Sequence, residues 1–220
     1  MFEESNTDSC FDAASHYLDS GFILNLARTR VNDEQFDLVA TEAYNTMNRI
    51  NLSKNNITSI FSVRYLSRTP VQEISLKSNF IDNLDEVILP DNLRKLDLSD
   101  NFIGSKFNQS LQEEELEISE ELRELNLSNN RLSSYETSEG DFGLKFLFNS
   151  DSISLNDLNV SGNNLTTLNF LKDFKDHPRA LNFTSSSDLF DGNNILPENC
   201  PVEDVPDTIK SLCESYKFRF

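Results

Sequence analysis

One eleven-residue pattern recurs five times in the chain and constrains its fold more than any other feature. Each copy has apolar residues at positions 1, 4, 6 and 11 and asparagine at position 9. The copies begin at Met47, Val71, Leu93, Leu122 and Leu155. Because each repeat of this kind is one structural unit that stacks on its neighbours, the pattern predicts an elongated solenoid.

Positions 4 and 6 predict a short β-strand in every copy. In the first copy Ile50 and Leu52 alternate with the polar residues Arg49 and Asn51. Alternation with period two places the apolar residues on one face of a strand and the polar residues on the other. We therefore expect parallel strands that bury their apolar face and present a polar one.

The asparagine at position 9 is predicted to be structural. Its side-chain amide has two N–H donors and a carbonyl acceptor, which suit the backbone groups of a turn. Stacked in a column, such amides would prevent buried unpaired backbone groups, each of which costs about 1–3 kcal/mol. The predicted asparagine ladder is Asn55, Asn79, Asn101, Asn130 and Asn163.

The pattern resembles that of intracellular leucine-rich repeat proteins over roughly residues 21–190. The resemblance implies an α/β fold, a right-handed solenoid with a curved parallel sheet on its concave face and short helices and irregular turns on its convex face. The C-terminal ends of the first two copies, around Asn55 and Asn79, resemble those of a short-repeat class. This class is found in protein phosphatase 1 regulatory subunits and in axonemal and spindle-pole adaptors. That class implies a partner such as a phosphatase, a cytoskeletal protein or a spindle-pole component.

Caps are expected at both ends of the solenoid. Residues 1–20 are predicted to form an N-terminal capping helix, because Phe11, Ala14 and Leu18 have helical spacing. Residues 21–190 are assigned to the solenoid, starting with a degenerate copy that has Thr29 in the asparagine slot. Residues 191–220 form the C-terminal cap, with a helix whose apolar face holds Ile209, Leu212, Cys213 and Tyr216.

Local signals add three predictions. Asn32 and Gln35 can form a capping box at the start of a helix. Residues 181–183 are expected to be the strand of a sixth, irregular copy, with Ser186 in the asparagine slot. Residues 140–143 have the composition of a turn.

The longest apolar run of the chain is much shorter than the roughly 20 residues that a helix needs to span a bilayer. The first residues of the chain lack the features of a signal peptide. These observations favour the cytoplasm or the nucleus. Cys200 and Cys213 are similar to the cysteines that close the C-terminal cap of secreted leucine-rich repeat proteins. In a reducing compartment we expect them to be free thiols.

The formal net charge of −18 disfavours binding to phosphate backbones and anionic membranes. The polar strand positions, however, hold cations and anions in similar numbers, so a concave binding face for another protein is predicted. The residues predicted to contact that partner are Asn48, Arg49, Asn51, Gln72, Glu73, Arg94, Lys95, Asp97, Arg123, Asn126, Asn156 and Asp157.

Catalysis has little support in the sequence. The two histidines, His16 and His177, lie near no recognisable nucleophile motif, and glycine-rich phosphate loops and paired-cysteine motifs are missing. We therefore expect a non-enzymatic protein without metal or cofactor. The alternative function is an RNA-associated subunit of a ribonucleoprotein or export complex, because related solenoids occur in such assemblies; the net charge argues against it.

Overall fold

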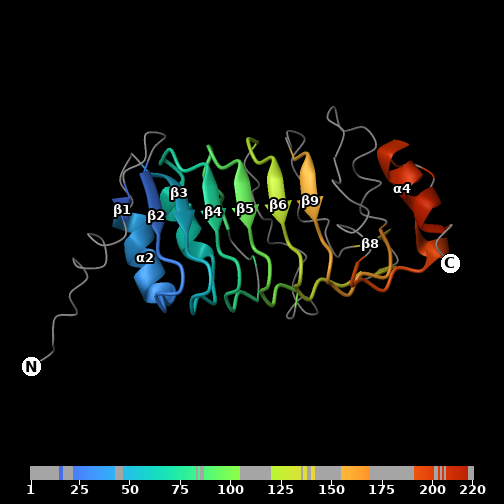
Figure 1. Ribbon diagram of the computed structural model, residues 1–220, viewed down its shortest axis with the longest axis horizontal. Coiled ribbons are helices and arrows are strands. Elements are labelled where there is room, and N and C mark those ends of the chain that lie inside the picture. Colours follow the sequence, from blue (N-terminus) through green and yellow to red (C-terminus); the bar gives the residue numbers. More distant parts are fainter. Residues whose placement is uncertain are drawn as a thin grey trace, which may run out of the picture.

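Seven strands form one sheet that follows the long axis of the molecule (Figure 1). The structure, a computed structural model, describes residues 15–16, 22–42, 47–82, 84, 87–104, 120–134, 136–137, 140–141, 155–168, 191–200, 203, 205 and 207–217. In spatial order the strands are β1 (Ser15–His16), β2 (Phe22–Asn25), β3 (Met47–Asn51), β4 (Glu73–Ser75), β5 (Lys95–Asp97), β6 (Glu124–Asn126) and β9 (Asp157–Asn159).

β2, β3, β4, β5, β6 and β9 are parallel, and their register aligns equivalent repeat positions. The predicted α/β solenoid with its parallel sheet is thereby confirmed. Position 4 forms a continuous buried row of Leu24, Ile50, Ile74, Leu96, Leu125 and Leu158. Positions 1, 6 and 11 of the five copies are buried as well, so the core extends through every repeat as one layer.

The asparagine ladder is present as predicted. Asn101, for example, donates from Nδ2 to the carbonyl oxygens of Leu76, in the preceding repeat, and of Leu98, in its own repeat, over 3.1 and 3.0 Å. Its Oδ1 accepts the N–H of Ile81, also in the preceding repeat, over 3.1 Å. Each such amide joins two repeats. Thr29 ends the ladder, with its N–H donating to Oδ1 of Asn55 and its hydroxyl to the carbonyl of Leu26.

A helix packs behind the first strands and begins where the capping box predicts. It is α2 (Asp33–Glu42), and its buried residues are Phe36, Val39 and Ala40. The N–H of Asn32 donates to Oε1 of Gln35, and the N–H of Gln35 donates to Oδ1 of Asn32, which confirms the capping box. α2 lies against the 3-10 helix η1 (Phe61–Leu66), which belongs to the next repeat.

The predicted N-terminal capping helix is wrong at Ser15 and His16. These two residues form β1, which pairs antiparallel with β2. The physical reason is that β2 would otherwise expose the backbone N–H and carbonyl groups along its outer edge. The other residues of this predicted helix lie outside the described residues.

The repeat pattern continues past residue 190, the predicted end of the solenoid. Oδ1 of Asn193 accepts the N–H of Leu165, and its Nδ2 donates to the carbonyl of Val160. Asn193 therefore takes a ladder position after Asn163, and Ile195 is buried two residues later. Ser186, which was predicted for the asparagine slot, lies outside the described residues. Residues 181–183 lie outside the described residues, and the division of the chain into cap, solenoid and cap stays a prediction.

The long connection after the fourth clear copy contains a small hairpin. Strands β7 (Glu136–Thr137) and β8 (Gly140–Asp141) pair antiparallel. The predicted turn at residues 140–143 is therefore wrong at its first two residues, because Gly140 and Asp141 pair with the preceding strand. Residues 142 and 143 lie outside the described residues.

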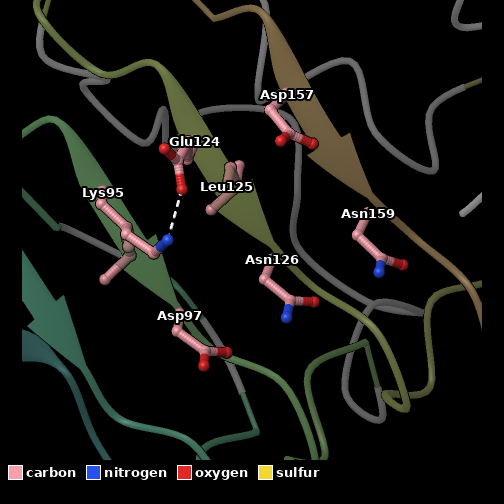
Figure 2. A pocket seen from close by; sticks show the side chains of 8 residues that line it. Lys95, Asp97, Glu124, Leu125, Asn126, Asp157 and Asn159 are labelled. Carbon is pink, nitrogen blue, oxygen red and sulfur yellow. Dashed lines mark hydrogen bonds and ion pairs between the residues drawn. The ribbon is translucent and has the colours of Figure 1, made fainter. Parts of the chain in front are cut away.

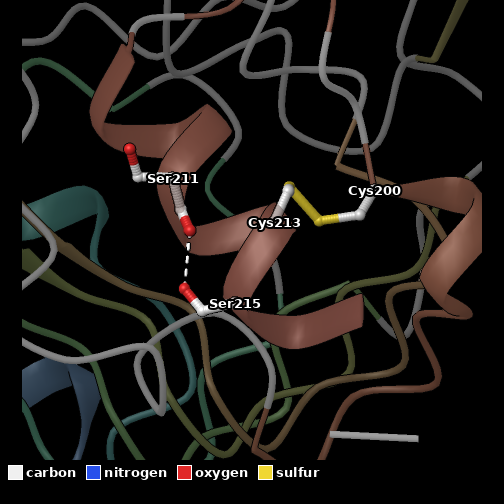
Figure 3. Close-up of a disulfide and its surroundings, with 4 residues drawn as sticks. All are labelled: Cys200, Ser211, Cys213 and Ser215. Carbon is white, nitrogen blue, oxygen red and sulfur yellow. Dashed lines mark hydrogen bonds between the residues drawn. A yellow bond between two sulfur atoms is a disulfide. The ribbon is translucent and has the colours of Figure 1, made fainter. Parts of the chain in front are cut away.

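The C-terminal end is closed by the 3-10 helix η4 (Pro197–Asn199) and by α4 (Asp207–Lys217). Ile209 and Cys213 of α4 are buried, as the apolar face predicts. Cys213 is bonded to Cys200, with sulfurs 2.01 Å and Cα atoms 5.6 Å apart (Figure 3). The expectation of free thiols is thus wrong, because α4 turns Cys213 inward to face the cysteine that follows η4.

Disulfides persist mainly in oxidising compartments, so this bond argues against the predicted cytoplasmic or nuclear location. The location itself is not tested by the structure and stays a prediction. Among the described residues, no helix has the length and apolar character that crossing a membrane requires.

Reducing the disulfide is expected to lower the free energy of unfolding by about 2–3 kcal/mol, because the bond closes a short loop and restricts the unfolded chain. Urea unfolding of the oxidised protein and of the Cys200→Ala/Cys213→Ala variant would measure this. Adding dithiothreitol should shift the midpoint of the parent but not of the variant. Equal midpoints for parent and variant would show that the bond does not stabilise the cap.

Candidate functional site

The exposed side of the sheet carries the predicted binding residues. We call it the sheet face and define it by repeat positions 2, 3 and 5; a column is the set of residues at one position in successive repeats. The strand register brings all twelve predicted residues into these three columns, and all are half-buried or exposed. Whether they bind a partner stays a prediction.

Column 3 is a ladder of charges in which neighbours pair across strands. An Nη of Arg49 lies 3.0 Å from Oε1 of Glu73, and Lys95 forms an ion pair with Glu124. Its hydrogen bond to Glu124 is the main reason that the pKa of Lys95 is raised, while partial burial opposes the shift. Both pairs are substantially exposed, so each contributes at most about 1 kcal/mol to stability. They hold the side chains in place more than they stabilise the fold.

Column 2 places two arginines around one carboxylate. Arg94 and Arg123 are adjacent in the column, and the N–H of Arg123 donates to the carbonyl of Arg94 over 2.9 Å. Both lie near Oε2 of Glu121, at 3.9 Å from Nε of Arg94 and 3.6 Å from an Nη of Arg123. Among the described residues, one carboxylate lies between the two guanidinium groups, so local positive charge remains and this part of the sheet face favours an anionic contact.

Column 5 has a structural role that the sequence analysis missed. The side-chain oxygens of Asn51, Asp97 and Asn126 each accept the N–H of the residue two positions later, over 3.0 Å. Asn25 and Asn159 make the same contact in their turns. These Asx turns end the strands. Asn51, Asp97 and Asn126 were predicted only as partner contacts; the recurrence of Asn or Asp at this position was the available signal for the turn.

A shallow pocket of about 290 Å³ lies on the sheet face across β5, β6 and β9 (Figure 2). Its charged residues are Lys95, Asp97, Glu124 and Asp157, so carboxylates outnumber the single cation. Glu124 and Asn159 line it too, although neither was among the predicted binding residues. Their repeat positions, 3 and 5, could have identified them. The pocket gives this end of the sheet face an acidic character.

At the edge of the sheet face, position 8 has left-handed backbone geometry. Lys54, Ser78, Asp100 and Asn129 have φ between 54° and 58°, and Gly162 has 64°. Asp100 accepts hydrogen bonds from Asn129 and Ser78 and pairs with Lys77 at 3.3 Å. Partial burial would raise the pKa of Asp100, but these contacts outweigh it and lower the pKa. Side chains at positions 7 and 8 of neighbouring repeats are thus joined by hydrogen bonds and an ion pair.

Comparison with known families matches two segments, residues 92–113 and 121–142, to the model described as Leucine Rich Repeat. Comparison with curated proteins finds no match. The matched segments contain β5 and β6, two of the three strands that line the pocket. Repeats of this family generally mediate protein–protein interactions.

Proposed function

We propose that this chain, in which two segments match the leucine-rich repeat model, is a non-catalytic adaptor that binds a protein partner across its sheet face. The observation that carries this proposal is column 3, in which charged side chains project next to one another from five consecutive strands. They are Arg49, Glu73, Lys95, Glu124 and Asp157. The similarity to short-repeat adaptors makes a phosphatase, a cytoskeletal protein or a spindle-pole component the first partner to test.

The backbone beneath these side chains is already ordered. In column 2 the N–H of Gln72 donates to the carbonyl of Asn48, and the N–H of Arg94 donates to the carbonyl of Gln72, each over 2.8 Å. The same bond continues to Arg123 and Asn156. An ordered scaffold reduces the conformational entropy lost on association, which favours recognition by this surface.

The charge pattern suits a protein surface better than a nucleic acid. Column 3 alternates cations with carboxylates before ending in Glu124 and Asp157. The acidic pocket would repel a phosphate backbone, whereas a protein can place cations opposite the carboxylates and anions opposite Arg94 and Arg123. Among the two functions considered, this pattern supports protein binding over RNA association.

The double variant Arg94→Gln/Arg123→Gln tests the proposed surface. We expect it to lose at least about ten-fold in partner recovery, because two guanidinium groups of the sheet face lose their charge and their forked hydrogen-bonding geometry. Its melting temperature should stay within about 2 °C of the parent, since both residues are exposed. Affinity purification from the native cell with quantitative mass spectrometry would measure recovery.

Arg68→Gln is the matched control, because Arg68 is exposed and follows η1 outside the sheet. It should recover the same proteins as the parent. Equal recovery by the double variant, or loss by Arg68→Gln, would contradict binding at the sheet face. Recovery that is abolished by ribonuclease and falls steeply with salt would favour the RNA-associated alternative.

A further inference from the structure

Outside the sheet face, repeat position 10 forms a column of exposed or half-buried side chains. Its members are Asn56, Phe80, Phe102, Arg131, Asn164 and Asn194. The backbone of this column is tied between repeats, since the N–H groups of Phe80 and Phe102 donate to the carbonyls of Ile57 and Ile81 over 2.8 Å. The adjacent position 11 is buried, so the backbone holds position 10 outward at fixed spacing.

The middle of this column is a stack of two aromatic rings and one guanidinium group. The rings of Phe80 and Phe102 are 6.0 Å apart between centroids and inclined by 18°. The guanidinium carbon of Arg131 lies 4.4 Å from the centroid of Phe102. Phe80 forms the other end of the stack and is 51% exposed. Its exposed ring offers an aromatic face on which a cationic or planar group can stack.

Among the described residues, two further aromatic rings that are half-buried or exposed lie close to an arginine. Arg64 lies 3.8 Å from the ring centroid of Phe61 and 5.4 Å from that of Tyr65. In the part of the chain that the structure describes, none of the cation–π contacts involves Phe80. Phe80 thus offers the same ring chemistry without the guanidinium group.

We propose that Phe80 binds an arginine side chain of a protein partner that carries a basic segment. A guanidinium group is attracted to the electron-rich ring face and stacks on it through its own plane. The net charge of −18 favours the approach of a cationic segment. Phe80, at position 10, is not part of the sheet face, so the contact does not depend on the sheet face being the docking surface.

The test uses hexa-arginine and hexa-lysine peptides, which have equal charge, as probes of the full chain. Phe80→Asn is the main variant, because asparagine occupies position 10 elsewhere in the same column and the net charge is unchanged. We expect hexa-arginine to bind the variant about two- to five-fold more weakly than the parent, as the loss of one exposed cation–π contact predicts. The ratio of hexa-lysine to hexa-arginine dissociation constants should therefore fall toward one.

A second readout is the ring signal of Phe80 in the NMR spectrum of the protein labelled with carbon-13 phenylalanine. The chain has 17 phenylalanines, so the signal is assigned by its loss in Phe80→Asn. The signal should move on titration with hexa-arginine. An unchanged ratio of dissociation constants, or a Phe80 signal that stays in place throughout the titration, would overturn the proposal. Neither result depends on Arg94 or Arg123, so the proposed function is tested separately.

Discussion

Replacing Leu96 with alanine is expected to lower the free energy of unfolding by about 2–5 kcal/mol. Leu96 is 1% exposed and lies in the position-4 row between Ile74 and Leu125. The truncated side chain would leave a cavity that the adjacent strands cannot fill, because interstrand hydrogen bonds hold their spacing. Urea denaturation followed by circular dichroism would measure the change.

Lys95→Ala is the matched control for this variant. Lys95 precedes Leu96 in the same strand, but its side chain points to the opposite, exposed face, where it pairs with Glu124. We expect a loss of no more than about 1 kcal/mol. Equal effects of the two substitutions would contradict the inward placement of Leu96 and, with it, the assignment of the two sheet faces.

Asn101→Ala should be almost as destabilising, with an expected loss of about 2–4 kcal/mol. The substitution removes the acceptor of the Ile81 N–H, which is buried, together with the donors to Leu76 and Leu98. The two carbonyls keep other ladder partners, Asn79 and Asn130, but the N–H of Ile81 would be left without an acceptor. Thermal unfolding monitored by circular dichroism would detect the loss.

Asn56→Ala provides the comparison, because Asn56 has the same chemistry in an equivalent turn but is exposed. Its loss should cost less than about 0.5 kcal/mol. If the two asparagine variants unfolded at the same temperature, the ladder would not contribute to stability in the way that its hydrogen bonds indicate.

Much of the fold was predictable because the repeat couples sequence spacing to side-chain direction. Alternation around Leu96 and Leu98 predicts the buried face, and asparagine at position 9 predicts the ladder. The capping box of Asn32 and Gln35 was also predictable, since its partners are only three residues apart. These features depend on neighbours within one repeat or on an equivalent residue in the next.

The candidate site was predictable in location but not in its pairings. The periodic pattern predicts that Arg49, Lys95 and Asp157 share one column. It does not indicate that Glu124 pairs with Lys95, or that the oxygens of Asn51 and Asn126 are already used in Asx turns. It also gave no reason to consider Phe80 and Phe102, because the contact between them exists only when successive turns stack.

The sequence by itself determined the solenoid, its buried rows and the asparagine ladder, because these follow from a short-range pattern that every copy repeats. Only the tertiary structure decided how the ends are closed. β1 pairs with the open edge of β2, Asn193 extends the ladder, and Cys200 meets Cys213. Each of these contacts joins segments outside the repeated pattern, so it depends on where the chain returns in space and not on periodicity.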